Sequence, residues 1–313
     1  MGTLSRSEDR APDASGTPAD ARERRGAPGR ARRLAIAVGL ADVRHEPDAA
    51  SELVTQARLW TEAAAGDERD GWTRVRLPDY EGWVRSAELK ATARQASPWV
   101  VVITAHMAPV FAGSQDARQL LAAPITAVLP LRHEDASDAD RLEVRLPGGH
   151  TGWVRRADVA VRDRARPFPP SGPPTALQLA HELIGTPYVW GGTSPRGIDC
   201  SGLAQLCYRQ AGCALPRDAD QQFAAVSYVV ERGDPQPGDL IFFAEQGEID
   251  HVGLSLGGSR VLNARMGAGR VVIDALDPGE PDYSPRLASM YAGARRPMPE
   301  WARGPAPERG EPA

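Results

Sequence analysis

The sequence is poor in cysteine: its 313 residues include only Cys200, Cys207 and Cys213. An odd, sparse set of this kind does not form a disulfide framework. If residues 200–207 are helical, the first two cysteines lie about 10 Å apart along the helix axis, which is too far for a disulfide bond. No CxxC pair or cysteine–histidine cluster has the spacing of a zinc site. We therefore expect no disulfide, no metal and no cofactor.

Long apolar runs are also absent, and none approaches the ~20 residues of a membrane span. The net charge of −4 gives no reason to expect nucleic acid or an anionic membrane as a partner. Residues 1–33 are polar and rich in Arg, Pro, Ala and Asp, which is typical of disorder. The first apolar run, at 34–43, could pass for a short signal sequence, but it lies late in the chain and the repeat described next needs it as a strand. We expect a cytoplasmic protein, with secretion as the alternative.

An internal repeat organises the first half of the chain. VRLPDYEGWVRSAEL at 75–89 recurs as VRLPGGHTGWVRRADV at 144–159, with one residue more before the tryptophan. Each unit has the short alternating strands and turn signals of a small β-barrel. The order of strand, turn and GWV resembles bacterial SH3-like (SH3b) domains. This resemblance predicts one SH3b domain at 34–95 and a second at 96–164.

The pattern changes after a proline-rich linker at 165–174. Two helices are predicted from apolar stripes that end at glycines, at 175–185 and at 200–211. Short apolar segments joined by Gly-containing turns then predict three strands, at 239–244, 251–256 and 260–265. Helices followed by an antiparallel meander indicate an α+β domain. We assign it to 175–302, followed by a flexible tail at 303–313.

Cys200 has the setting of a nucleophile. It lies in the sequence DCSG, at the predicted first turn of a helix, where the helix N-terminus and a nearby imidazolium would lower a thiol pKa. We expect this first-turn position to be exposed. Cys207 and Cys213 are interpreted as structural thiols.

A cysteine nucleophile needs a base, which is usually histidine, and a polar group that fixes the imidazole ring. Of the two histidines in this domain, His181 lies on the first helix and His251 begins a strand. A three-residue loop at 257–259 would pair residue 253 with residue 263, which places His251 and Asn263 diagonally on one face. A slip of one residue would turn Asn263 away.

The segments TPYVWGGTSPRGIDCSGL, PGDLIFF, DHVGLSLGG and VLNA together resemble the NlpC/P60 cysteine peptidases, which have a papain-like core. The resemblance covers about 175–298. It implies that Cys200 is the nucleophile, that His251 is the base and that Asn263 takes the third polar position, where many members have histidine. It also implies that Tyr188 helps to polarise the scissile carbonyl; the alternative is packing beside the cysteine helix.

Two SH3b domains before such a domain resemble the γ-D-glutamyl-L-diamino acid endopeptidases that recycle wall peptides. In that subgroup the free L-Ala amine of the substrate sits in a pocket between the catalytic domain and the first SH3b domain. An ammonium ion in such a pocket needs carboxylates or other acceptors around it. The resemblance assigns substrate binding to Glu52, Tyr80, Tyr188, Trp190, Asp199, Ser201 and Asp218. The alternatives are that Asp199 is only a helix N-cap and that Glu52 is a solvated strand residue.

We therefore expect a monomeric cysteine peptidase with peptidoglycan-derived peptides as its partners. It would hydrolyse the bond between γ-D-Glu and an L-diamino acid (diaminopimelate or Lys) in peptides with a free N-terminal L-Ala, and release L-Ala-γ-D-Glu. A secreted hydrolase that acts on intact peptidoglycan is one alternative. Another is a wall-binding SH3b protein with an inactive peptidase domain, against which the presence of Cys200, His251 and Asn263 argues.

Overall fold

The computed structural model describes residues 33–92, 97–133 and 140–297. The segment predicted to be disordered, 1–33, lies outside these residues except for Arg33, and so does the predicted tail at 303–313. Arg33 belongs to the first strand, so the first domain begins one residue earlier than predicted. None of the helices in the described part of the chain is long and apolar enough to cross a membrane.

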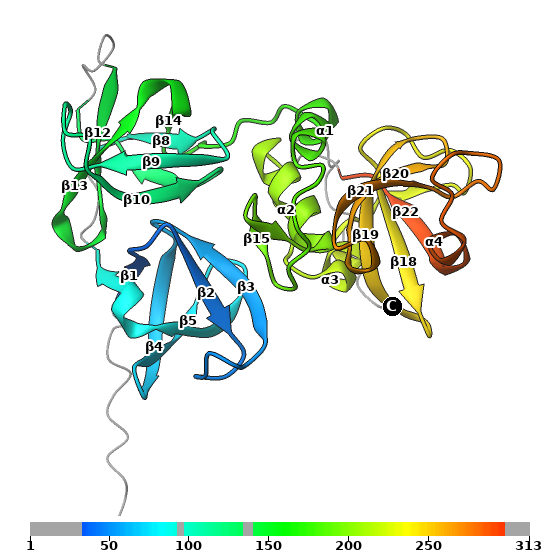
Figure 1. Cartoon of the computed structure of the whole chain (residues 1–313), viewed down its shortest axis with the longest axis horizontal. Coiled ribbons are helices and arrows are strands. Elements are labelled where there is room, and N and C mark those ends of the chain that lie inside the picture. Colours follow the sequence, from blue (N-terminus) through cyan, green and yellow to red (C-terminus); the bar gives the residue numbers. More distant parts are fainter. Residues whose placement is uncertain (1–32, 93–96, 134–139, 298–313) are drawn as a thin grey trace, which may run out of the picture. The chain divides into compact units, whose positions relative to one another are not determined.

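The first domain is an antiparallel sheet with the strand order β3-β2-β6-β5-β4-β1-β7 (Figure 1). Its apolar residues alternate along the strands, so that Ile36, Val43 and Val84 lie fully buried in a core of its own. The elements are β1 Arg33–Ile36, β2 Leu40–Arg44, β3 Leu53–Arg58, β4 Glu62–Arg69, β5 Trp72–Arg76, β6 Glu81–Arg85, the 3-10 helix η1 Ser86–Glu88 and β7 Leu89–Ala91.

The described residues of the second domain also form only strands and short 3-10 turns. It forms one sheet in the order β10-β9-β13-β12 and another in the order β11-β8-β14. Its core also takes in Ala35, Leu59 and Trp60 of the first domain. The elements are β8 Trp99–Ile103, β9 Met107–Phe111, β10 Gln119–Pro124, β11 Val128–Pro130, β12 Arg141–Arg145, η2 Pro147–Gly149, β13 Thr151–Arg155, η3 Arg156–Asp158 and β14 Val159–Asp163.

The sequence repeat corresponds to a repeated hairpin. Val75 pairs with Gly82 in the first domain, and Val144 pairs with Gly152 in the second. A Cβ atom on either glycine would meet a valine methyl group of the neighbouring strand at 2.6 Å. The glycine before each tryptophan is therefore required by close strand packing. An SH3b assignment for the second domain stays a prediction.

The third domain joins four helices to a six-stranded antiparallel sheet in the order β17-β22-β18-β19-β20-β21 (Figure 1). The helices are α1 Pro173–Glu182, α2 Cys200–Gln210, α3 Ala219–Ala225 and α4 Pro285–Met290. The strands of this sheet are β17 Val229–Val230, β18 Leu240–Glu245, β19 Glu248–Gly257, β20 Arg260–Arg265, β21 Arg270–Ala275 and β22 Tyr291–Arg295, with η4 at Met266–Ala268. The short strands β15 Thr193–Ser194 and β16 Gly197–Ile198 pair in a separate two-stranded sheet. The predicted α+β class is confirmed.

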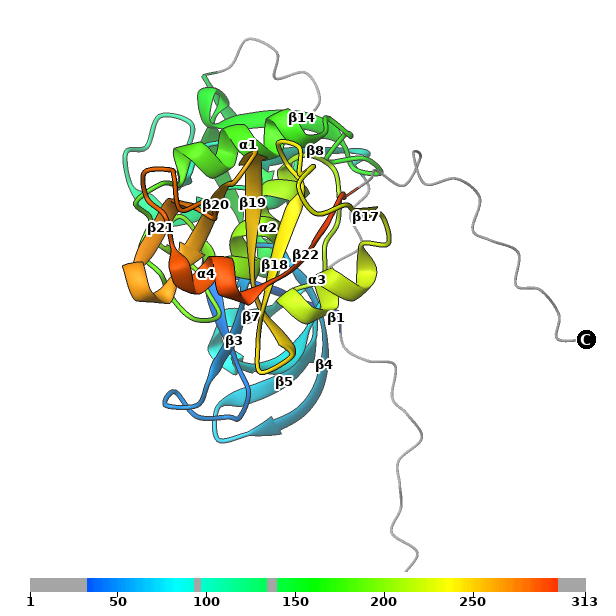
Figure 2. The ribbon, with the colours of Figure 1, turned by 90° about the vertical axis from the view of Figure 1, so that its right-hand side faces the viewer.

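Helices cover both faces of this sheet. Figure 2 looks onto the sheet from the side of α4, and the helices α1 and α2 lie behind it. Leu240 and Phe242 of β18 pack in the core that α1 and α2 share, whereas Ile241 and Phe243 pack toward Leu287 of α4. This explains the unbroken apolar run in β18, because both faces of the strand are buried.

Several predicted boundaries differ from the structure, among them those of β18 (predicted at 239–244) and β19 (predicted at 251–256). Helix α1 begins at Pro173, inside the predicted linker, because proline suits the first helical turn. It ends at Glu182, and Gly185 with φ of 87° lies beyond it. Gly257 pairs with Arg260 beside a β-bulge, so the loop between β19 and β20 has two residues instead of three.

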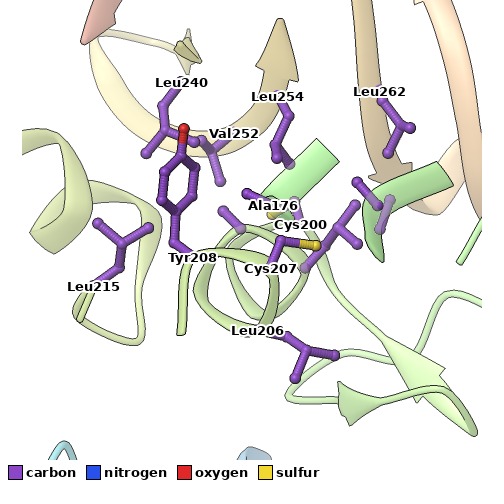
Figure 3. Packing of buried hydrophobic residues seen from close by; sticks show 14 of the residues in the cluster. Ala176, Cys200, Leu206, Cys207, Tyr208, Leu215, Leu240, Val252, Leu254 and Leu262 are labelled. Carbon is purple, nitrogen blue, oxygen red and sulfur yellow. The ribbon is translucent and has the colours of Figure 1, made fainter. Parts of the chain in front are cut away.

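Helix α2 packs against the middle of the sheet. Figure 3 shows Cys200 and Cys207 on this helix, close to Val252 and Leu254 of β19. Cys207 is fully buried and Cys213 is 7% exposed. All three cysteines are free thiols.

Candidate active site

Cys200 is the first residue of α2, as predicted. Asp199 is the N-cap, and its Oδ1 accepts a hydrogen bond from the Gly202 backbone N–H at 2.7 Å. The prediction that Cys200 is exposed is wrong, since the residue is only 7% exposed. It lines a cleft.

The expected lowering of the Cys200 pKa is also wrong. Burial raises the pKa of the Cys200 thiol to about 12, and the charge of Asp199 adds to the rise. Hydrogen bonds from the backbone at Val252 and Ser201 favour the thiolate without offsetting burial. Burial also lowers the pKa of His251. Burial thus favours the neutral thiol of Cys200 and the neutral imidazole of His251.

His251 and Asn263 meet as predicted. Leu254 pairs with Leu262 in the predicted register, and His251 Nε2 lies 2.9 Å from Asn263 Oδ1. The bulge falls between Ser255 and the loop, so it leaves the register of the inner part of the hairpin unchanged.

Asp274 on β21 extends this arrangement, although sequence reasoning missed it. The buried carboxylate accepts a hydrogen bond from Asn263 Nδ2 at 2.9 Å, and it pairs with Arg265 at 3.0 Å. A carboxylate only accepts, so the amide nitrogen of Asn263 faces Asp274 and the amide oxygen faces His251. Nε2 of His251 must then carry the proton, and Nδ1 is the nitrogen that can accept one.

A cleft of about 280 Å³ lies over Cys200. Its walls come from the first domain and from the third domain, and the predicted site residues Glu52, Tyr80, Tyr188, Trp190, Asp199, Cys200, Ser201 and Asp218 all line it. Residues that were not predicted, including Arg217, Asp220 and Asp250, line it as well. Five carboxylates against one guanidinium give the lining a formal charge of −4.

Arg217 fills the inner part of the predicted acidic pocket. It is 1% exposed and donates to Asp199 Oδ1 at 3.0 Å and to Asp199 Oδ2 at 2.5 Å. It also donates to Ser201 Oγ at 2.8 Å and to Thr55 Oγ1 of β3 at 3.0 Å. Asp199 and Ser201 therefore have an internal cation as partner. Their oxygen atoms already accept hydrogen bonds from Arg217, so Asp199 and Ser201 contribute mainly to the structure of the site.

The outer part of the cleft keeps its negative charge. Asp218 is half-buried and hydrogen-bonds Tyr80, and burial followed by the charge of Asp218 raises the pKa of Tyr80 to about 12. Burial also raises the pKa of Asp218. Glu52 is exposed and accepts a hydrogen bond from Trp190 Nε1 at 2.8 Å. Glu52 and Asp218 thus face one space from two domains.

The loop between α1 and α2 holds the first domain against the cleft. Gly191 has φ of 73°, and a Cβ there would lie 2.1 Å from the Leu53 carbonyl oxygen. The backbone N–H of Thr193 donates a hydrogen bond to Gln56 Oε1 at 3.2 Å. On the same loop, burial raises the pKa of Tyr188, and the nearby Cys200 adds to the rise. The Tyr188 hydroxyl therefore stays protonated beside the thiol and can donate a hydrogen bond.

No group of three or more His, Cys, Asp or Glu side chains that could hold a metal ion occurs within 33–92, 97–133 and 140–297. The cleft presents the Cys200 thiol and the Tyr188 hydroxyl, and His251, next in sequence to the lining residue Asp250, supplies an imidazole with a fixed tautomer. That combination suits nucleophilic attack on an acyl carbon.

Comparison with known families agrees with this geometry. Residues 185–286 match the NlpC/P60 family, and residues 43–89 match the bacterial dipeptidyl-peptidase SH3 domain. The NlpC/P60 match contains Cys200, His251 and Asn263, and the SH3 match contains Glu52 and Tyr80.

Similar proteins cover most of the chain. A γ-D-glutamyl-L-lysine dipeptidyl-peptidase from Bacillus cereus is 28% identical over 80% of this chain and 77% of its own length. Dipeptidyl-peptidase 6 from Lysinibacillus sphaericus is 27% identical over 80% of this chain and 94% of its own length. The crystal structure of an NlpC/P60 family protein from Bacillus cereus superposes with a TM-score of 0.74, at 25% identity, over 85% of this chain and all of that one.

Proposed function

Because the chain is a cysteine peptidase of the NlpC/P60 family, we propose that it cleaves peptidoglycan stem peptides between γ-D-Glu and an L-diamino acid. Two similar proteins are named γ-D-glutamyl-L-lysine dipeptidyl-peptidases, which supports cleavage at this bond. We further propose that the substrate carries a free N-terminal L-Ala and that the product is L-Ala-γ-D-Glu.

The observation that carries the proposal is the outer part of the cleft. Glu52 and Asp218 approach it from two domains, with the Tyr80 hydroxyl between them in the same lining. A peptide ammonium bound there gains charge-assisted hydrogen bonds of ~1.5–3 kcal/mol each. Because Arg217 already neutralises Asp199, the selective acceptors are Glu52, Asp218 and Tyr80, and not the three carboxylates that the sequence suggested.

The reaction follows from the protonation states. Nδ1 of His251 accepts the thiol proton of Cys200 as the sulfur attacks the γ-D-Glu carbonyl carbon. The proton on Nε2 stays bonded to Asn263 Oδ1, which steadies the imidazolium that forms. The tetrahedral oxyanion takes a hydrogen bond from the Tyr188 hydroxyl. The imidazolium then protonates the departing amine, and water, with His251 as base, hydrolyses the thioester.

A walled pocket for a free amine implies small, released peptides as substrates, which supports a role in recycling in the cytoplasm. A lactyl-linked glycan on L-Ala would remove the ammonium charge and collide with the first domain, because Glu52 and Trp190 close the cleft on that side. Digestion of intact wall by a secreted enzyme is the competing function.

The test compares L-Ala-γ-D-Glu-L-Lys with its N-acetyl derivative, with products identified by mass spectrometry. We expect cleavage after γ-D-Glu and a fall in kcat/KM of at least ~10-fold on acetylation, because the acceptors are then left unpaired. Similar kcat/KM for the two peptides, or ready digestion of intact sacculi, would favour the secreted hydrolase.

A further inference from the structure

A second cavity of about 440 Å³ lies where the first domain meets the far end of α2. Its lining includes Arg58 and Trp60 from the first domain, and Gln205 and Arg209 from α2. Cys200 begins α2, so Arg209 lies about 14 Å away along the helix axis. None of the residues that line the catalytic cleft lines this cavity.

In the part of the chain that the structure describes, two arginines of this cavity each have a buried Nε donor without a hydrogen-bond partner, although the guanidinium of Arg209 lies over the Phe168 ring, 4.9 Å from its centroid. Arg58 is 8% exposed, and its Nη2 donates a hydrogen bond to the Thr193 carbonyl oxygen at 2.7 Å. Within the described residues, the buried Nε atoms of Arg58 and Arg209 have no hydrogen-bond acceptor. A buried donor without a partner is costly. Both donors belong to side chains that line the same cavity.

The arginines that line the cavity are more buried than the acids that line it. Burial, and then the like charge of Arg209, lowers the pKa of Arg58 to about 9. Two acids line the cavity, Asp79 and Glu62, and both are exposed. Asp79 accepts from Gln205 Nε2 at 3.1 Å, and its charge raises the pKa of Arg58 and of Arg209, although less than burial lowers them. The exposed Asp79 therefore offsets the positive charge of the two guanidinium groups only in part.

We propose that this cavity binds a small oxyanion, a phosphate or carboxylate group, between Arg58 and Arg209. A guanidinium presents parallel N–H donors that match two oxygens of such a group. The cavity is larger than inorganic phosphate requires and falls within the range of small-molecule sites, so it admits an organic molecule that carries the anionic group.

The bound anion would connect two domains. Arg58 ends β3, in the domain that brings Glu52 and Tyr80 to the catalytic cleft, and Arg209 lies on the helix that begins with Cys200. An oxyanion held by both would strengthen this interface. Ligand binding to the folded state then raises the unfolding temperature by mass action.

The test uses the full chain and inorganic phosphate as the probe, with succinate as a separate arm that tells a phosphate site from a carboxylate site. Calorimetric titration and thermal unfolding are measured at fixed pH and constant ionic strength, with chloride as the reference. We expect saturable binding of one oxyanion per chain and a rise in Tm. Arg209→Gln should weaken the binding at least ~10-fold, because a charge-assisted hydrogen bond is lost.

Two controls locate the site. Arg118→Gln changes an exposed arginine of the second domain and should bind as the original chain does. Cys200→Ala should also bind normally, since the catalytic cleft is acidic. Arg58→Gln provides a second variant if Arg209→Gln does not fold. Equal binding by Arg209→Gln or Arg58→Gln and the Arg118→Gln control, or no saturable binding of either probe, would overturn the proposal.

Discussion

Replacing Asp274 by Asn tests the chain of contacts behind the catalytic histidine. Asp274 is 4% exposed and does not line the cleft. Its Oδ2 accepts from Asn263 Nδ2 at 2.9 Å and from Arg265 Nε at 3.1 Å, and its Oδ1 accepts from Arg265 Nη2 at 3.0 Å. In the variant, the new amide has one acceptor and one donor group for two donor partners, so one charge-assisted hydrogen bond is lost. That bond corresponds to ~1.5–3 kcal/mol.

The loss should appear in turnover and not in substrate binding. If the transition state loses the whole free energy of this hydrogen bond and the bound substrate loses none, kcat falls by ~10–100-fold while KM changes little. The negative charge of Asp274 raises the pKa of His251, whereas Arg265 lowers it. Removing the carboxylate therefore lowers the His251 pKa further, and the acid limb of the kcat/KM profile moves to lower pH.

The assay is steady-state cleavage of L-Ala-γ-D-Glu-L-Lys across pH, with Tm measured in parallel. Asp282→Asn is the matched control, since Asp282 is an exposed acid of the same domain and Asn tolerates its φ of 61°. An unchanged kcat in a folded Asp274→Asn protein, or an acid limb that moves upward, would refute this reasoning.

Three further outcomes are expected. Arg217→Met leaves the buried carboxylate of Asp199 without its cation. The free energy of unfolding, measured by urea titration, should therefore fall by about 3–5 kcal/mol. A fall of less than about 1 kcal/mol would contradict the assigned ion pair. Burial lowers the pKa of His251, and the catalytic base must be neutral. In the original chain, the midpoint of the acid limb of the kcat/KM–pH profile should therefore lie below the ordinary histidine pKa of ~6.5. A midpoint above that value is inconsistent with a buried base. Tyr80→Phe loses its hydrogen bond to Asp218 and should raise KM about 10-fold with kcat nearly unchanged; an unchanged KM would remove Tyr80 from the amine pocket.

Local patterns in the sequence were sufficient to predict the catalytic pair. The apolar stripe and Gly212 placed Cys200 at the start of α2, and the strand pattern placed Asn263 opposite His251. Both predictions depend on spacing within one helix or one hairpin. The unexpected bulge beside Gly257 does not change the pairing register of His251 and Asn263, because it lies outside the paired segment that holds the two residues.

Contacts between distant segments were not predictable in this way. Arg217 reaches Thr55, 162 residues earlier in the chain, and Asp274 reaches Asn263 from a strand that the apolar pattern did not reveal. The burial of Cys200 follows from the packing of β19 and of the first domain around α2. A single helix pattern carries no information on such packing, so the expected exposure and lowered pKa of Cys200 were wrong.

The central claim is that Cys200 is the nucleophile that cleaves after γ-D-Glu. The most direct measurement is kcat/KM for L-Ala-γ-D-Glu-L-Lys with the original chain, with Cys200→Ala and with Cys207→Ala, each checked for folding by circular dichroism. Cys200→Ala should lose at least ~10⁴-fold, since nucleophile and base act as a unit. Cys207 is fully buried beneath the sheet, so its variant should keep its activity in the folded fraction. Near-normal release of L-Ala-γ-D-Glu by a folded Cys200→Ala protein would contradict the account.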